Sequence, residues 1–113
     1  MIVFSLSIFA PDDRRADILD SFAALLEPTR VEVGCVACHL YIDSEDPNAI
    51  TLIEEWASQS ALDRHLASDA CKTLVAAMEL SVRAPPIRFD RVAERAGIEV
   101  IEAARLDRGS SLP

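Results

Sequence analysis

The chain has 113 residues, half of them apolar, a size and composition typical of one domain with a single buried core. Its 19 Asp and Glu residues outnumber its 11 Lys and Arg residues, and the formal net charge is -8. Such a surface repels phosphate backbones and anionic lipids, so we expect neither nucleic-acid nor membrane partners. The first residues lack the basic segment of an export signal, and three cysteines is an odd count. We therefore expect a cytoplasmic protein without a disulfide framework.

The first thirty residues predict a strand followed by a helix. Apolar and smaller residues alternate from Ile2 to Phe9, the period of a half-buried strand. Pro11 and the two aspartates after it suit the start of a helix, where negative charge is favourable. Pro28 is expected to end that helix. The apolar residues at helical spacing are Ile18, Leu19, Phe22, Leu25 and Leu26.

The rest of the pattern is two strands, a helical region and a further strand. Residues 35–43 and 49–56 alternate, and the turn-rich segment 43–48 makes them a plausible hairpin. Ser58 or Ser60 can cap a first helix, and Ser68-Asp69 can cap a second one. Pro85-Pro86 then stops the helical region, and residues 87–92 predict a fourth strand. Within the helical region the apolar stripe of the second helix consists of Cys71, Leu74, Val75, Met78 and Val82.

The resulting order, β-α-β-β-α-β, predicts an α+β, ferredoxin-like fold in residues 1–93, with helices on one face of an antiparallel sheet. The other face would carry apolar residues without cover, so we expect a homodimer formed through the sheets. Residues 94–113 form a C-terminal extension outside the pattern. Its segment Ile98 to Ile101 could be an edge strand contacting the partner or a short helix, and the strand is favoured here. The final residues, 107–113, are expected to be loose.

Residues 34–39 spell Gly-Cys-Val-Ala-Cys-His, the C-x-x-C-H motif of covalent haem attachment. In a regular strand, Cys35 and Cys38 would point to opposite faces and could not converge on one haem or metal ion. A redox C-x-x-C pair is also disfavoured, because such pairs occur at helix N-termini. We therefore interpret the cysteines as small strand residues and expect no metal site.

Three segments of the chain resemble the antibiotic biosynthesis monooxygenase (ABM) family of the dimeric α/β-barrel superfamily. They are LLEPTRVEVGC (25–35), YIDSEDPNAITLIEEW (41–56) and SALDRHLASDACKTL (60–74). The order and spacing of these segments carry the resemblance, which covers roughly residues 2–92. The resemblance implies a dimeric α/β barrel and places His65 on a histidine that recurs in the family. Catalytic activity varies among members of the family.

Three residues are the candidate catalytic groups. Trp56 can fill the core, or it can form a pocket wall whose indole N–H faces a substrate oxygen. Glu54 shares its strand face and, if buried, needs a basic partner or a substrate proton. His65 lies among apolar helix residues, where a histidine is either a hydrogen-bonded core residue or a base.

Candidate substrate-binding residues are His39, Tyr41 and Leu62. The face of the second strand that carries Val36, Cys38 and Leu40 is apolar throughout, which favours packing against the helices. His39 and Tyr41 would then point towards the dimer partner, whereas Leu62 lies on the helix that carries His65.

The leading functional hypothesis is a cofactor-independent monooxygenase that oxidises a small aromatic quinol or anthrone with dioxygen. Such chemistry needs a base, a dry pocket and donors for an oxyanion, for which His65, Trp56 and Glu54 are the candidates. The sequence has no glycine-rich nucleotide loop and no metal-binding pattern, so no cofactor is expected.

Three alternatives remain open. A haem-degrading relative is disfavoured, because serines occupy the first strand where those enzymes carry asparagine, and Val75 lies near the position of the expected haem ligand. A proton-transfer isomerase acting on a small metabolite would use the same base without oxygen. A dimeric protein that binds a small ligand without turnover would use the pocket alone.

Overall fold

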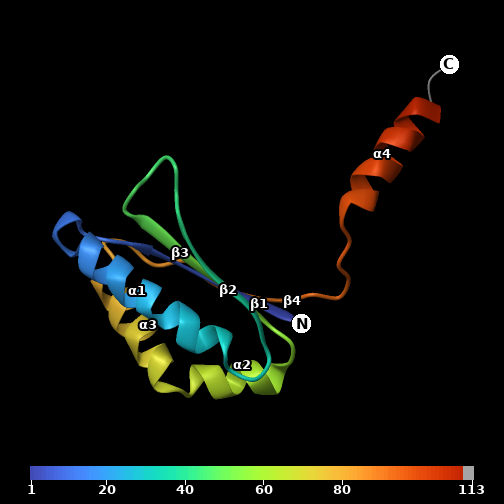
Figure 1. Ribbon diagram of the computed structural model, residues 1–113. Coiled ribbons are helices and arrows are strands. Elements are labelled where there is room, and N and C mark those ends of the chain that lie inside the picture. The colour runs from blue at the N-terminus through green and yellow to red at the C-terminus, as the bar shows by residue number, and fades with distance from the viewer. Residues whose placement is uncertain (111–113) are drawn as a thin grey trace.

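The structure, a computed structural model, describes residues 1–110 and has the predicted α+β, ferredoxin-like order of elements (Figure 1). A single turn of 3₁₀-helix, η1 (Asp12–Arg14), precedes the first long helix. The strands are β1 (Ile2–Phe9), β2 (Cys35–Ile42), β3 (Ala49–Trp56) and β4 (Ile87–Arg91). The α-helices are α1 (Arg15–Arg30), α2 (Gln59–Leu66), α3 (Asp69–Leu80) and α4 (Ile98–Ser110).

The four strands form one antiparallel sheet in the order β2-β3-β1-β4. The predicted hairpin of β2 and β3 is present, and its turn is held by Asp43 and Asp46, whose side chains accept backbone N–H groups. Helices α1, α2 and α3 lie together on one side of the sheet (Figure 1). The other side, called the open face below, carries no helix of the described chain.

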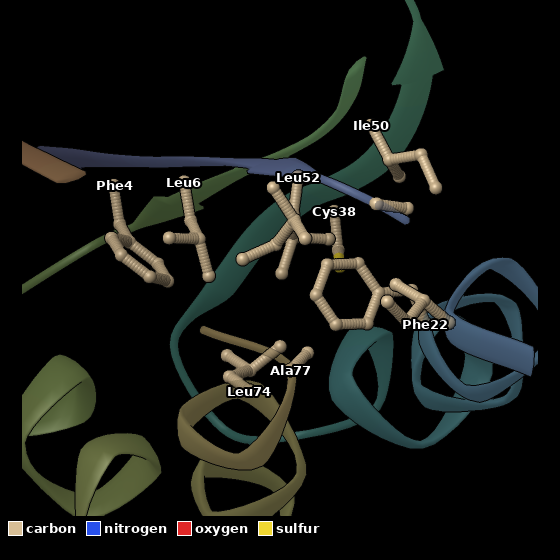
Figure 2. Packing of buried hydrophobic residues seen from close by; sticks show 11 residues of the cluster. Phe4, Leu6, Phe22, Cys38, Ile50, Leu52, Leu74 and Ala77 are labelled. Atoms are coloured by element: carbon tan, nitrogen blue, oxygen red, sulfur yellow. The ribbon is translucent and has the colours of Figure 1, made fainter. Parts of the chain in front are cut away.

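The core lies between the sheet and these helices. Ile2, Phe4, Leu6 and Ile8 of β1 all face the helices, as the alternation predicts. Figure 2 shows strand residues from this face, Leu6 and Leu52 among them, pointing towards Phe22 of α1 and Leu74 of α3. A second, smaller cluster, called the tryptophan cluster below, is made of Ile2, Trp56, Ala61 and Leu62.

Pro28 does not end α1, which continues to Arg30. Proline fixes a helical φ and lacks only its own N–H, so near a C-terminus it removes a single hydrogen bond. The two residues after Pro28 contribute to packing and hydrogen bonding: Thr29 is buried, and the Nε of Arg30 donates to the carbonyl of Cys38 at 2.9 Å. The prediction of a helix end at Pro28 was therefore wrong by two residues.

A β-bulge changes the faces of β2. Cys35 lies opposite Trp56, Cys38 lies opposite Glu54, and the register shifts between Cys35 and Ala37. Both cysteines consequently pack on the helix side, Cys38 in the main core and Cys35 against both clusters. The prediction of opposite faces was wrong, because strict alternation fails where an extra residue is inserted into a strand.

The C-terminal extension forms helix α4, so the strand favoured for Ile98 to Ile101 was wrong. Glu99 accepts the N–H of Gly97 at 2.7 Å at the start of this helix, and Glu, Ala, Arg and Leu are good helix formers. α4 stands apart from the sheet and from the other helices (Figure 1). The expectation of a loose end falls partly on this helix and partly on residues 111–113, which lie outside the described residues. Within residues 1–110, no helix combines the length and the apolar character that crossing a membrane requires.

Candidate active site

The structure brings together the three candidate catalytic residues on the helix side of the sheet. Glu54 and Trp56 come from β3, and His65 comes from the last turn of α2. All three residues are buried, with exposed fractions of 1% or less. The helix that carries His65 begins where predicted, because the hydroxyl of Ser58 accepts the N–H of Ala61.

Polar contacts link these residues in a chain. The indole N–H of Trp56 donates to Oε1 of Glu54 at 3.0 Å, and Nε2 of His65 lies 3.1 Å from the same oxygen. The second contact is an ion pair whose N–H is not aimed at the oxygen, so Nε2 has no well-aligned acceptor. On its other side, Nδ1 of His65 lies 2.8 Å from Oε2 of Glu32. We call Glu32, His65, Glu54 and Trp56 the His65 relay.

The charges around His65 favour its protonated form. Burial by itself lowers the pKa of His65, but the adjacent carboxylates of Glu54 and Glu32 outweigh burial and raise it above its ordinary value of 6.5. The indole ring of Trp56 lies 4.6 Å from the imidazole ring, close enough to stabilise an imidazolium through its π-face. The His65 relay can therefore hold a proton between two carboxylates.

Glu32 was not recognised as a candidate from the sequence. It lies in the loop between α1 and β2, 33 residues before its partner His65, and its side chain is 31% exposed. Gly34 positions this loop: its φ is 90°, and a Cβ atom there would collide with Ala61 of α2. Only glycine combines this backbone conformation with so close an approach to the helix. The resemblance segment 25–35 contains Glu32, but nothing local in the sequence points it towards α2.

A pocket of about 220 Å³ adjoins the tryptophan cluster. It is lined by Ile2, Gln59, Leu62, Leu66, Phe89 and Arg91. Ile2 and Leu62 belong both to its wall and to the tryptophan cluster, so one layer of side chains separates the pocket from Trp56. Leu62, predicted to bind substrate, thus lies between the pocket and the His65 relay.

Hydrogen bonds fix the two polar groups of this pocket. Nη2 of Arg91 donates to Oε1 of Gln59 at 3.0 Å, and Nε2 of Gln59 donates to Asp63 at 2.8 Å. The ring of Phe89 stacks on Phe4 at 4.8 Å. Arg91, Phe89 and Gln59 were not singled out in the sequence, because their meeting depends on the pairing of β4 with β1 and on the position of α2.

The other two candidates, His39 and Tyr41, lie on the open face, as their alternation with Cys38 predicts. Both are exposed, and their ring centroids are 6.3 Å apart. His39 lies opposite Ile53, and Tyr41 lies opposite Thr51. These side chains are therefore on the other side of the sheet from the His65 relay.

Cys35 and Cys38 are not activated thiols. Burial, with the nearby charge of Glu54, raises the pKa of Cys38 to about 12 and also raises the pKa of Cys35. Reactive thiols have lowered pKa values. Cys38, enclosed in the main core, leaves no room for attachment to a haem. In the described part of the chain, no group of three or more His, Cys, Asp or Glu side chains is arranged to hold a metal ion.

Solved structures share this fold along nearly their whole length. The Mycobacterium tuberculosis protein Rv0793 has 24% sequence identity and a TM-score of 0.76, and the alignment covers 85% of this chain and 98% of that one. A crystal structure of an antibiotic biosynthesis monooxygenase, also 24% identical, aligns with a TM-score of 0.74 over 83% of this chain and 100% of that one. The Pseudomonas aeruginosa protein PA3566 is 25% identical, with a TM-score of 0.70 over 81% of this chain and 94% of that one.

Sequence comparison identifies the family. The protein sll1783 of Synechocystis sp. is 30% identical over 64 residues, which are 57% of this chain and 44% of that relative, so the match spans less than half of the relative's length. The sequence model described as "Antibiotic biosynthesis monooxygenase" matches residues 1–77, a range that includes the whole His65 relay. On that match, the chain belongs to the antibiotic biosynthesis monooxygenase family.

Proposed function

We propose that the protein is a cofactor-independent monooxygenase that oxidises a small quinol, anthrone or related phenol with dioxygen. The observation that carries the proposal is the buried His65 relay next to an apolar pocket. The pocket of about 220 Å³ can hold one or two rings of such a substrate, since an engineered cavity of ~150 Å³ binds benzene. Family membership and the relative named as a monooxygenase support the reaction class.

The relay supplies what this chemistry demands of a protein. Deprotonation of a phenol or of an activated methylene gives an anion that can pass an electron to dioxygen. One oxygen atom becomes the new carbonyl oxygen, and the other leaves as water with the two hydrogens lost by the substrate, so no external reductant is needed. Neutral His65 would accept the substrate proton, and Glu32, partly exposed, would pass it on to solvent.

Access to His65 requires a movement of the pocket wall. Ile2 and Leu62 line the pocket and pack with Trp56, and the imidazole of His65 lies 4.6 Å from the indole ring and does not line the pocket. The indole N–H of Trp56 already donates to Glu54, so Trp56 acts in this proposal by positioning that carboxylate, and Glu54 acts by holding the imidazole.

The test is dioxygen uptake by the purified, metal-free protein with a panel of naphthols, quinols and anthrones. Wild type should consume oxygen, and His65→Gln should lower the rate about 100-fold or more, the ordinary contribution of a positioned base. Lys72→Gln, which removes an exposed α3 side chain paired only with the exposed Asp69, is the matched control. Uptake that is equal in wild type and His65→Gln would refute the role of His65.

A proton-transfer isomerase is the second candidate. The position of His65 between two carboxylates favours this activity, because such a relay can return a proton to another carbon of the substrate. Hydrogen–deuterium exchange at an activated substrate carbon, without oxygen uptake, would distinguish this activity. Ligand binding without exchange or uptake would indicate a non-catalytic binding protein.

We also propose that the protein is a homodimer in which the open faces of two sheets meet. Ile53, at the centre of that face, is flanked by Ser5 and His39, and it is only half-buried in the single chain. Tyr41 beside it is exposed. A second sheet would remove this apolar surface from water.

A further inference from the structure

The pocket beside the tryptophan cluster combines an apolar interior with one arginine. Ile2, Leu62, Leu66 and Phe89 supply the apolar lining, and Arg91 and Gln59 supply the polar atoms. Phe89 is held flat by stacking on Phe4, with the planes of the rings 12° apart. A planar ring can pack against such a surface, and a charged group on that ring would meet the guanidinium.

Arg91 is oriented but not neutralised. Asp63 accepts from the Gln59 amide nitrogen, which leaves the amide oxygen of Gln59 to accept from Arg91. Within residues 1–110, Arg91 has no carboxylate within ion-pair distance, although the chain has 19 acidic residues. Its Nε and Nη1 groups donate no hydrogen bond to the described residues. One edge of the guanidinium is therefore open to an incoming anion.

The neighbouring arginine of β4 provides a contrast. Arg88 lies on the opposite face of the strand, and its Nε donates to Asp90 at 2.9 Å. Arg88 is thus neutralised within its own strand. The arginine at the pocket is oriented by an uncharged amide, an arrangement that keeps its charge available.

From this geometry we propose that the pocket binds an aromatic carboxylate of one or two rings. The ring packs between Phe89 and the leucines of α2, and the carboxylate accepts hydrogen bonds from Arg91. Arginine suits this task because its planar fork matches the two oxygens of a carboxylate. This inference names the substrate class of the proposed monooxygenase and rests on it only for turnover, since binding can be measured without oxygen.

The experiment measures binding of benzoate and of benzamide, its uncharged counterpart, to the full-length protein by titration calorimetry or ligand-observed NMR. We expect benzoate to bind about 10-fold more tightly than benzamide, the difference that a charge-assisted hydrogen bond provides. In Arg91→Gln the preference should disappear, and Arg91→Lys should retain only part of it. Arg88→Gln, the matched control on the same strand, should keep the full preference.

Three outcomes would overturn the proposal: equal binding of both probes to wild type, no binding of benzoate, or an equal loss in Arg88→Gln and Arg91→Gln. The proposed oxidation is tested separately, by measuring oxygen uptake. A preference for benzoate that depends on Arg91, with no oxygen uptake on any hydroxylated aromatic acid, would leave the binding site standing and refute the monooxygenase. Oxygen uptake with uncharged phenols alone, without preferential binding of benzoate, would support the monooxygenase and refute the carboxylate site.

Discussion

Nδ1 of the buried His65 imidazole lies 2.8 Å from Oε2 of Glu32, a loop carboxylate that reaches the surface. This contact joins the interior of the site to solvent. On the other side of the imidazole ring, Nε2 of His65 contacts the buried carboxylate of Glu54. The protonation of His65 therefore depends on two carboxylates from different parts of the chain, and each can be altered separately.

Glu32→Gln should lower the pKa of His65, because the amide still accepts a hydrogen bond from Nδ1 but no longer carries a negative charge. Titration of the imidazole by NMR measures this change directly. For the proposed oxidation, kcat/KM should rise with pH as His65 loses its proton, and this rise should move to lower pH in the variant. Glu27→Gln, which removes an exposed carboxylate paired with Arg30, is the control. An unchanged titration of His65 in Glu32→Gln would contradict the role of Glu32.

The stability of the fold should depend on pH through His65. Its pKa is raised in the folded state, so its contribution is fully present below the unfolded value of 6.5 and is lost as the pH rises through the folded pKa. Urea unfolding between pH 6 and pH 9 should show a free energy of unfolding that decreases towards alkaline pH. In His65→Gln this decrease should be smaller, and an identical slope in both proteins would rule out His65 as its source.

Gly34→Ala should destabilise the protein by about 1–3 kcal/mol, the usual cost of a strained backbone conformation. The positive φ and the contact with Ala61 both oppose a Cβ atom at this position. The loop should move away from α2, so His65 should titrate as it does in Glu32→Gln. Gly97→Ala is the control, because its nearest contact is the flexible carboxylate of Glu99. Equal stability of the two variants would contradict this prediction.

Leu62→Ala should open the pocket towards Trp56. The stability should fall by about 2–5 kcal/mol, as for other buried leucines, and the fluorescence of Trp56, the only tryptophan in the chain, should become more accessible to acrylamide. Leu74→Ala removes an equally buried leucine from the main core, away from the pocket. Leu74→Ala should lower the stability by a similar amount but leave the acrylamide quenching of Trp56 unchanged.

Ile53→Arg should convert the proposed dimer into a monomer, because two charges would face each other without partners at the centre of the interface. Light scattering coupled to size-exclusion chromatography measures the mass. Val31→Arg, at an exposed site directly after α1, should remain dimeric. A monomeric wild type would refute the dimer itself.

The sequence by itself determined the architecture. Alternation in β1 and β3 and the helical stripe of α1 are local patterns, and burial of their apolar faces favours a layered arrangement. Of the stripe predicted for α3 only Leu74 is fully buried, because Val75 is exposed and Val82 lies beyond the end of the helix. The shared strand face of Glu54 and Trp56 followed from the same alternation. The sequence also drew attention to His65, whose position on a short apolar helix could be read locally.

Only the tertiary structure decided which groups meet His65. Glu32 reaches it from 33 residues away because Gly34 allows a loop to approach α2, and Arg91 reaches Gln59 because β4 pairs with β1. The bulge at the start of β2 reversed the face of Cys35, and helix α4 replaced the strand favoured for residues 98–101. Local patterns record which face of an element is apolar. Contacts between distant elements depend on register, loop geometry and helix position, which the packing of the whole chain fixes.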